Sequence, residues 1–172
     1  MRHRALFVLC VLALCVVVAV RRLDRPPGVE SRSLGDLDPA FRERLEQVLT
    51  QLEHRGFHPR IRATWRSPER QRHYRRLGWS RLDWGLHCAT TPDGRPAALA
   101  ADVDDARAAT DPQRARFYLA LREAAPDHGL VTGGTWSRSS RRWARYDLGW
   151  DPGHVQPAGL TSAQARAGER PW

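Results

Sequence analysis

The chain has 172 residues, with 28 basic and 19 acidic side chains and a formal net charge of +9. Its hydrophobic content of 41% and its seven Trp exclude a disordered chain, while 12 Pro and 13 Gly favour an irregular α+β domain over a helical bundle. The basic side chains are all Arg, and no basic run alternates with aromatic residues as in a nucleic-acid-binding motif, so we expect no nucleic-acid partner.

The N-terminal segment has the pattern of an export signal. Residues 1–4 are basic, residues 5–20 form an unbroken apolar stretch of 16 residues, and Arg21 and Arg22 close it. A transmembrane helix usually needs about 20 apolar residues, but no small-residue cleavage site precedes Arg21. We therefore predict that residues 1–22 form a hydrophobic helix that acts as a signal anchor rather than a cleaved signal peptide. The rest of the chain would then face the periplasm from the bacterial inner membrane, or be exported.

A linker and a helix are predicted next. Residues 23–37 combine Pro and Gly with mixed charges, which favours a linker. Asp38 followed by Pro39 is typical of a helix start, because Asp caps free N–H groups and Pro fits the first turn. We expect this helix to end near Gly56. Its predicted apolar face consists of Phe41, Leu45, Val48, Leu49 and Leu52.

The middle of the chain alternates strand and helix signals. Residues 58–65 predict a short strand, and residues 67–77 predict a helix that begins at a Ser-Pro pair and stops before a Gly. Residues 79–95 are rich in turn-forming types and predict a long loop, and long loops in compact domains are often functional. Residues 97–103 are small and apolar, which indicates a buried strand.

A further helix is predicted in the C-terminal half, from Asp111 to Gly129. We place three short strands after it, at residues 130–132, 143–146 and 154–156. The folded domain is therefore predicted over residues 38–160, and residues 161–172 are predicted to be a polar tail.

Four side chains outside the predicted helix faces suit metal chemistry. His87 lies in the long loop, Asp102 ends the Ala-rich strand, and His154 follows Asp151 at a spacing of three. Two His and one carboxylate leave the fourth position of a tetrahedral zinc open, as a catalytic site requires, and a further carboxylate can take a proton from water. From spacing alone, a solvated acidic turn and unrelated His residues remain the simpler alternative.

The order of several short motifs adds to this pattern. The chain contains, in order, Trp65-Arg66-Ser67, Gln71, Gly78, Ser80, His87, Ala98-Leu99-Ala100-Ala101-Asp102, Gly133-Gly134-Thr135-Trp136 and Asp151-Pro152-Gly153-His154. This series resembles the VanY-type peptidoglycan metallopeptidases, a family that includes D-Ala-D-Ala carboxypeptidases and dipeptidases and the L-alanyl-D-glutamate endopeptidases of phage endolysins. The resemblance extends over about residues 61–156.

The resemblance implies roles for five residues. His87, Asp102 and His154 match the family's zinc ligands, and Asp151 matches the catalytic carboxylate that activates water. Arg66 matches an Arg that stabilises the developing oxyanion or holds substrate, which suits a charged fork of N–H donors. The resemblance also implies Zn2+ as the cofactor and an α+β fold in which a small antiparallel sheet with flanking helices surrounds the zinc site.

The chain also departs from the family pattern. Gly85 stands where the family has Ser, and the spacing from His87 to Asp102 is fifteen residues instead of seven. The longer spacing leaves Asp104 as an alternative ligand. Gln156 stands where the family often has Glu.

We therefore predict a monomeric enzyme that hydrolyses peptide bonds in the peptidoglycan stem peptide, as an L,D-endopeptidase or a D,D-carboxypeptidase, with a slight preference for the endopeptidase. A catalytically inactive cell-wall-binding module of the same fold is the alternative. A basic, membrane-anchored nucleic-acid binder is a third possibility, and its binding to DNA would depend steeply on salt. Trp136, Trp143 and Trp150 are expected either to line a substrate groove or to pack in the core.

Overall fold

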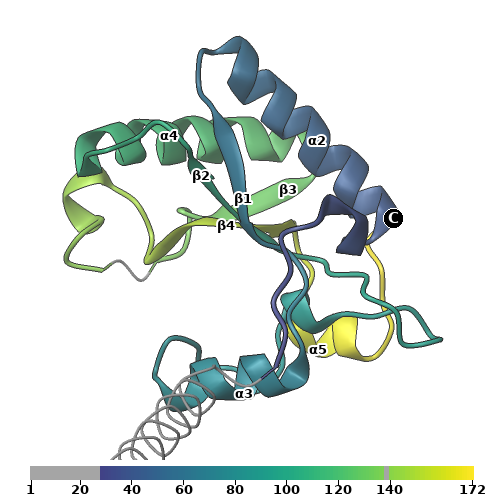
Figure 1. The fold of residues 1–172 in the computed structure, drawn as a ribbon. Helices are drawn as coiled ribbons and strands as arrows, with labels where there is room; N and C mark the ends of the chain where they lie inside the picture. Colours follow the sequence, from purple (N-terminus) through teal and green to yellow (C-terminus); the bar gives the residue numbers. More distant parts are fainter. Residues whose placement is uncertain (1–27, 138–139) are drawn as a thin grey trace, which may run out of the picture.

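A computed structural model describes residues 28–137 and 140–172. The predicted signal anchor, residues 1–22, and the first part of the predicted linker lie outside these described residues. Within the described part of the chain, no helix has the length and apolar character needed to cross a membrane. The elements in chain order are η1 (Leu34–Asp36), α2 (Pro39–His54), β1 (Pro59–Ala63), α3 (Pro68–Arg76), η2 (Leu86–Cys88), β2 (Ala101–Asp105), α4 (Asp111–Ala124), η3 (Ala125–His128), β3 (Leu130–Gly133), η4 (Ala144–Tyr146), β4 (Asp151–Pro157) and α5 (Ser162–Arg166), where η marks 3-10 helices (Figure 1).

The four strands form one antiparallel sheet in the order β1-β2-β4-β3. β1 pairs with β2, β2 with β4, and β4 with β3. Because β2 lies between β1 and β4, residues far apart in the sequence become neighbours, and Asp102 on β2 is the register partner of His154 on β4. The predicted α+β class with a small antiparallel sheet and flanking helices is confirmed, and the hydrophobic helix predicted before it lies outside the described residues.

Helices α2 and α4 cover one side of the sheet (Figure 1) and build the core with it. Asp38 caps α2 through the free N–H groups of its first turn, as predicted. The buried residues of its apolar face are Phe41, Leu45, Val48 and Leu52. Leu49, predicted on the same face, is half-buried. Helix α4 is stabilised by a reciprocal cap between Thr110 and Gln113.

The helix predicted from Asp111 to Gly129 is two helices in the structure. The α-helix α4 ends at Ala124, and the tighter η3 continues to His128. Pro126 has no N–H to donate to the preceding turn, so the α-helical hydrogen-bond pattern cannot continue through it. Gly129 then ends the segment with a φ of 69°, a conformation that favours glycine.

Two predicted strands differ in the structure. Residues 144–146 form the helix η4, with Trp143 as its N-cap, rather than a strand, because Trp143 packs edge-on against Tyr118 at 5.3 Å in the core and Asp147 turns the chain with a φ of 57°. β2 begins at residue 101 instead of 97. The N–H groups of residues 97 and 99 bond to the 86–89 segment and that of residue 98 bonds to Asp36, so these residues are not part of the β2 ladder.

The described part of the predicted linker is instead packed on the domain. Ser31 exchanges two backbone hydrogen bonds with Thr64 and Trp65, each 2.8 Å long. Glu30 and Arg66 form the adjacent antiparallel bridge. This pairing is made by backbone groups, which every sequence has. The segment therefore shows no hydrophobic period from which the pairing could be predicted.

The predicted polar tail is also folded. Thr161 and Gln164 form a reciprocal cap that starts α5. Trp172 packs against the core, with the guanidinium of Arg44 4.5 Å from its ring centre. The polar composition of this segment did not indicate the short helix α5 or the packing of Trp172 on the core.

Candidate metal centre

The three predicted metal ligands come together in one cavity. Asp102 and His154 meet across the β2–β4 ladder, and His87 approaches from η2. Oδ1 of Asp102 lies 3.3 Å from Nε2 of His87 and 3.2 Å from Nδ1 of His154. The ligand atoms of all three residues lie within 4.8 Å of one another. This spacing allows one metal ion to contact all three side chains.

The long spacing between His87 and Asp102 does not separate them in space. The inserted residues leave the domain as a loop whose two ends meet, because the Ala97 N–H donates to the Ala89 carbonyl at 3.0 Å. The backbone of His87 is fixed separately, since its carbonyl accepts a 2.9 Å hydrogen bond from the Arg66 N–H. The insertion therefore adds surface without moving the predicted ligands.

Each His directs one ring nitrogen towards Asp102 and uses the other to hold its position. Nδ1 of His87 lies 2.5 Å from the Thr64 carbonyl, which can only accept, so this nitrogen carries the proton. Nε2 of His154 lies 3.1 Å from Oε1 of Gln156, whose amide nitrogen donates to the Leu160 carbonyl. Anchoring of the second ring nitrogen by an oxygen is the usual support of a metal-bound His.

The two ring nitrogens that face Asp102 show whether a cation fits between the three side chains. In their neutral forms, His87 Nε2 and His154 Nδ1 both present lone pairs to the carboxylate oxygen of Asp102. Three lone pairs converging within hydrogen-bond distance repel one another unless a proton or a cation lies between them. Two imidazole nitrogens and one carboxylate oxygen are also ligands that Zn2+ accepts, with a fourth position left open. The donor set therefore fits a divalent metal ion.

The electrostatics of the cluster point the same way. Burial by itself would raise the pKa of Asp102, but His87 and His154 outweigh it and hold the pKa of this carboxyl well below its usual range. Burial would likewise lower the pKa of His154, but its hydrogen bond with Asp102 raises it. A positive charge shared between these side chains is thus favoured, and a metal ion provides that charge while releasing the proton.

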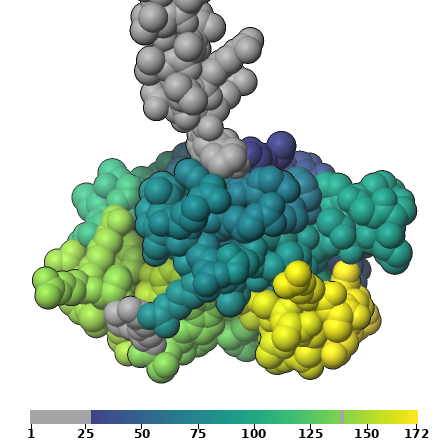
Figure 2. Space-filling model, turned by 90° about the horizontal axis from the view of Figure 1, so that it is seen from below, coloured from purple at the N-terminus to yellow at the C-terminus, as the bar shows by residue number. Residues whose placement is uncertain are grey.

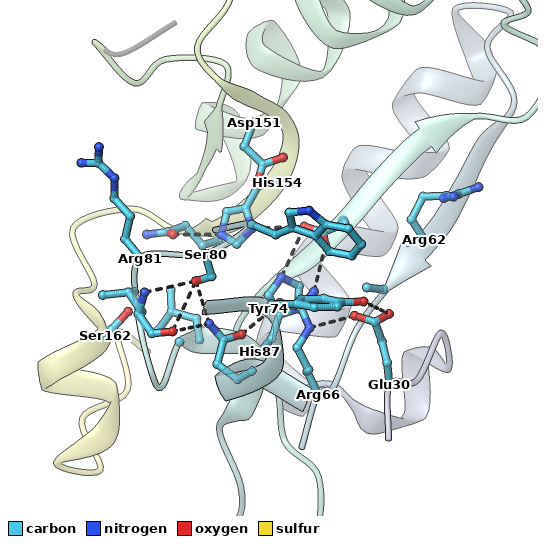
Figure 3. Close-up of a pocket in the computed structure, with 18 of the residues that line it drawn as sticks. Glu30, Arg62, Arg66, Tyr74, Ser80, Arg81, His87, Asp151, His154 and Ser162 are labelled. Carbon is cyan, nitrogen blue, oxygen red and sulfur yellow. Dashed lines mark hydrogen bonds and ion pairs between the residues drawn. The ribbon is translucent and has the colours of Figure 1, made fainter. Parts of the chain in front are cut away.

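Asp151 stands beside this cluster without belonging to it. It lies at the start of β4, lines the same cavity, and is drawn next to His154 in Figure 3. Burial raises the pKa of its carboxyl, and the negative charge of Asp102 raises it further. A buried carboxyl beside the predicted ligands is placed to exchange protons with a group bound there.

Arg66 is buried beside the cluster and held on every side. Its Nε donates to Glu30 at 2.7 Å, and one terminal nitrogen donates to Gln71 at 3.0 Å. The other terminal nitrogen lies 3.5 Å from Oδ2 of Asp102. The guanidinium also stacks 4.5 Å from the ring centre of Tyr74, whose hydroxyl donates to Glu30 (Figure 3). Arg66 is therefore fixed with one edge facing the predicted ligands.

The cavity has a volume of about 580 Å³. Trp136 and Trp150 form one wall, with ring centres 5.5 Å apart, and Trp136 lies 5.3 Å from the His154 ring. Trp143, the third Trp that we considered for a groove, is buried in the core. Arg62 and Arg81 lie on opposite sides of the cavity in Figure 3.

The structure also places the alternative ligand and two supporting side chains that no motif indicated. Asp104, the alternative ligand, pairs with Arg60 at 2.9 Å and is not in the metal-binding cluster. Glu30 and Tyr74 support Arg66 although no motif included them. Tyr74 lies in the predicted helix that follows Arg66, so its closeness to Arg66 could have been found from the sequence. Glu30 lies in a segment without periodicity, and its closeness to Arg66 could not.

No protein-family model matches this chain. No curated protein matches it either. Among solved structures, the L-Ala D-Glu endopeptidase ChiX of Serratia marcescens is similar, with a TM-score of 0.51 and 20% identity over 79% of this chain and 95% of that one. The D,D-pentapeptidase VanY from a VanB-type resistance cassette, an E175A mutant in complex with Zn(II), gives a TM-score of 0.45 and 14% identity over 76% of each chain. The LD-carboxypeptidase LdcB gives a TM-score of 0.45 and 12% identity over 76% of this chain and 62% of that one.

The similarity to ChiX establishes the fold of this chain, because it covers nearly all of that protein. It confirms, at the level of the fold, the resemblance on which the sequence analysis rests.

Proposed function

We propose that this chain is a zinc-dependent peptidase that hydrolyses peptide bonds in the stem peptide of peptidoglycan. One observation carries the proposal. Two anchored imidazoles and one carboxylate converge beside a fixed arginine and a second buried carboxyl, in a cavity that can hold a peptide. The fold shared with ChiX supports the same reading.

His87, Asp102 and His154 would hold the metal. When bound, zinc supplies Lewis-acid polarisation of a carbonyl and lowers the pKa of water towards neutrality. The polar atoms of these three side chains that do not face the metal position are already engaged, by the Thr64 carbonyl, Arg66 and Gln156 respectively.

Asp151 and Arg66 would act on the substrate. The Asp151 carboxylate accepts a proton from the attacking water and, as the carboxylic acid, returns it to the leaving amine. The guanidinium edge of Arg66 that faces the cluster stabilises the oxyanion that develops on the scissile carbonyl. Because Glu30, Gln71 and Tyr74 already fix this guanidinium, it needs little reorganisation during the reaction.

The finer specificity that we propose is cleavage between L-Ala and D-Glu. An endopeptidase requires a groove open towards both sides of the scissile bond, and cavity-lining residues lie on both sides of the cluster (Figure 3). Arg62, on one side of the cavity, provides a cation for a carboxylate of an acidic stem peptide. A D,D-carboxypeptidase would not need a groove that is open on both sides, because its substrate ends at the free terminal carboxylate.

The test uses the detergent-solubilised full chain, loaded with zinc and incubated with purified peptidoglycan. Products are identified by mass spectrometry, with a metal chelator and His154→Ala as controls. We expect chelator-sensitive release of peptides that begin with D-Glu. Release of D-Ala alone would identify a carboxypeptidase. Sedimentation of the protein with peptidoglycan without any release would identify the inactive wall-binding module.

We further propose that the chain acts at the outer face of the inner membrane, held by residues 1–22, or after export. The apolar stretch of 16 residues between flanking Arg residues supports this location. Fractionation of cells, with protease added to spheroplasts, tests it. Protection of the chain from external protease would contradict the proposal.

A further inference from the structure

Exposed apolar side chains gather on one part of the surface. Of the five large hydrophobic residues that are exposed in the described chain, three lie within six residues after α3. They are Leu77, Trp79 and Leu82, with 47%, 65% and 48% of their surfaces exposed. A monomeric soluble protein rarely leaves such a group in water without a partner.

This group is surrounded by arginine. Residues 69–83 contain five Arg and two acidic residues, and the acids are already engaged by Arg72 and Arg75. Arg76 and Arg81 are exposed, and neither has an ion-pair partner among residues 28–137 and 140–172. We call Arg76, Leu77, Trp79, Arg81 and Leu82 the α3-loop surface. Figure 2 looks onto the side of the molecule where α3 and this loop lie.

The backbone holds the loop after α3 away from the domain. Gly78 adopts a φ of 74° and has no neighbouring atom within 4 Å of the position that a Cβ would take. Trp79 turns back so that its ring lies 5.3 Å from Tyr74, which leaves its other face in water. The exposed positions are therefore set by the backbone and by one aromatic contact rather than by a frayed end.

The same side of the molecule is tied to the N-terminal apolar stretch. Gly28 and Val29, the first described residues, lie against Ser67 and Arg70 at the start of α3. The apolar stretch ends at Val20, and eight peptide links at about 3.5 Å each allow at most about 28 Å between these points. If that stretch enters a membrane, α3 cannot be far from the lipid.

We propose that the α3-loop surface docks on an anionic lipid surface. Trp and Leu enter the headgroup boundary, where Trp is favoured, and Arg76 and Arg81 bind the negative headgroups. Exposed aliphatic side chains combined with arginines that have no ion-pair partner among the described residues fit lipid better than a wall polymer, which offers charge without an apolar layer. Because Trp79, Arg81 and Leu82 also line the cavity, docking would place its mouth beside the lipid headgroups.

The test follows the environment of residue 77 in the full chain. Leu77→Cys is labelled with an environment-sensitive fluorophore after Cys10→Ser and Cys15→Ser, while Cys88 is buried and stays. The protein is reconstituted with phosphatidylglycerol vesicles or with phosphatidylcholine vesicles. Glu53→Cys, exposed at the end of α2 on the opposite side of the fold from α3 (Figure 1), is the matched control position.

We expect a blue shift of the fluorophore at residue 77 on phosphatidylglycerol vesicles and none at residue 53. The shift should disappear in about 1 M salt, where charges are screened beyond about 3 Å. Arg76→Glu and Arg81→Glu should each lower the docking equilibrium by about fivefold or more. The control pair Arg107→Glu and Arg116→Glu, which has the same net charge change at exposed sites elsewhere, should have little effect.

Three results would overturn the proposal. The fluorophore at residue 77 could stay in water on both vesicle types. It could shift without any vesicles, which would identify the chain's own apolar segment as the occupant. It could shift only when peptidoglycan fragments are added, which would identify the wall as the partner. None of these readouts depends on peptidase activity, so the proposed function is tested separately.

Discussion

Glu30 accepts a hydrogen bond of 2.7 Å from Nε of Arg66, across 36 residues of sequence. Its second carboxylate oxygen accepts the hydroxyl of Tyr74, which in turn lies under the same guanidinium. Glu30, in the predicted linker, thus sets the orientation in which Arg66 faces the predicted ligands. The segment that looked like a linker in the sequence is part of the site.

Removal of Glu30 should therefore impair Arg66. A hydrogen bond to a charged group contributes about 1.5–3 kcal/mol, so Glu30→Ala should lower kcat by about 10- to 100-fold while zinc content stays unchanged. Glu30→Gln keeps an acceptor and should lose less. Steady-state kinetics on a stem peptide and metal analysis provide the measurements.

The control for Glu30 is a double-mutant cycle. In an Arg66→Ala background, Glu30→Ala should cause little additional loss of kcat, because its effect passes through the guanidinium. Tyr74→Phe removes only the second contact to Glu30 and should cause a smaller loss. Equal losses in both backgrounds would show that Glu30 acts on the fold in general and not on Arg66.

Removal of a predicted ligand should abolish metal binding. Zinc bound at one equivalent per chain should fall in His154→Ala, with affinity reduced by more than about 100-fold, since loss of even an outer partner of a ligand costs about 10- to 100-fold. His54→Ala, at an exposed position far along α2, provides the matched control. Competition with a chromogenic chelator measures both. Full zinc content in His154→Ala would exclude this residue from the metal site.

Gln156 stands where the family often has Glu, and in the structure it holds His154 in place. Its Oε1 accepts from His154 Nε2, and its amide nitrogen is held by the Leu160 carbonyl. Gln156→Ala should weaken zinc binding by about 10- to 100-fold. Gln156→Glu keeps the acceptor and should retain most of the affinity. Similar losses in both variants would mean that the amide donor to Leu160, rather than the acceptor, is what holds His154.

The prediction of the metal ligands combined local patterns with the family resemblance. Asp102 follows a small apolar run and His154 follows Asp151 by three residues, but spacing alone left a solvated acidic turn as the simpler alternative. The order of the motifs, matched to the family pattern, made Asp102 the preferred ligand over Asp104. The start of α2 followed from neighbouring residues and from a simple period, whereas the small antiparallel sheet was implied by the family resemblance.

Other features depend on contacts between distant segments. Glu30 supports the site through backbone pairing with the Arg66 segment, and Trp143 sits in the core because Tyr118 receives it. Residues 97–99 look like part of a strand, but their N–H groups bond to Asp36 and to the 86–89 segment. Such choices are made by tertiary packing, which overrides local preference.

The close approach of Gly28 to α3 should be measurable as stability. A Cβ at Gly28 would overlap Ser67 Oγ and the Arg70 backbone, and its φ of 80° is already unfavourable for other residues. Gly28→Ala should lower the free energy of unfolding by about 1–3 kcal/mol. Gly94→Ala has nearly the same φ, 83°, but open space around it, and should cost less. Urea unfolding compares the two, and equal losses would show that the 28–33 segment is not packed as described.

Gly133 separates the position of Asp151 from the metal ligands. A Cβ on Gly133 would collide with the backbone of Asp151, its partner across the β3–β4 ladder, where the register shifts. In Gly133→Ala the two strands must move apart at this point, which displaces the carboxyl that we propose as the proton acceptor.

His154 lies three residues further along β4 and pairs with β2, so it should keep its place. We therefore expect Gly133→Ala to retain zinc binding while kcat falls by about 100-fold, because a misplacement of about 1 Å can cost that much. Gly134→Ala meets only side chains of Thr132, Leu148 and Pro152, at 3.1 Å or more, and should keep most of the activity. If both variants lose zinc together with activity, the collision has disrupted the whole ladder and Asp151 is not displaced alone.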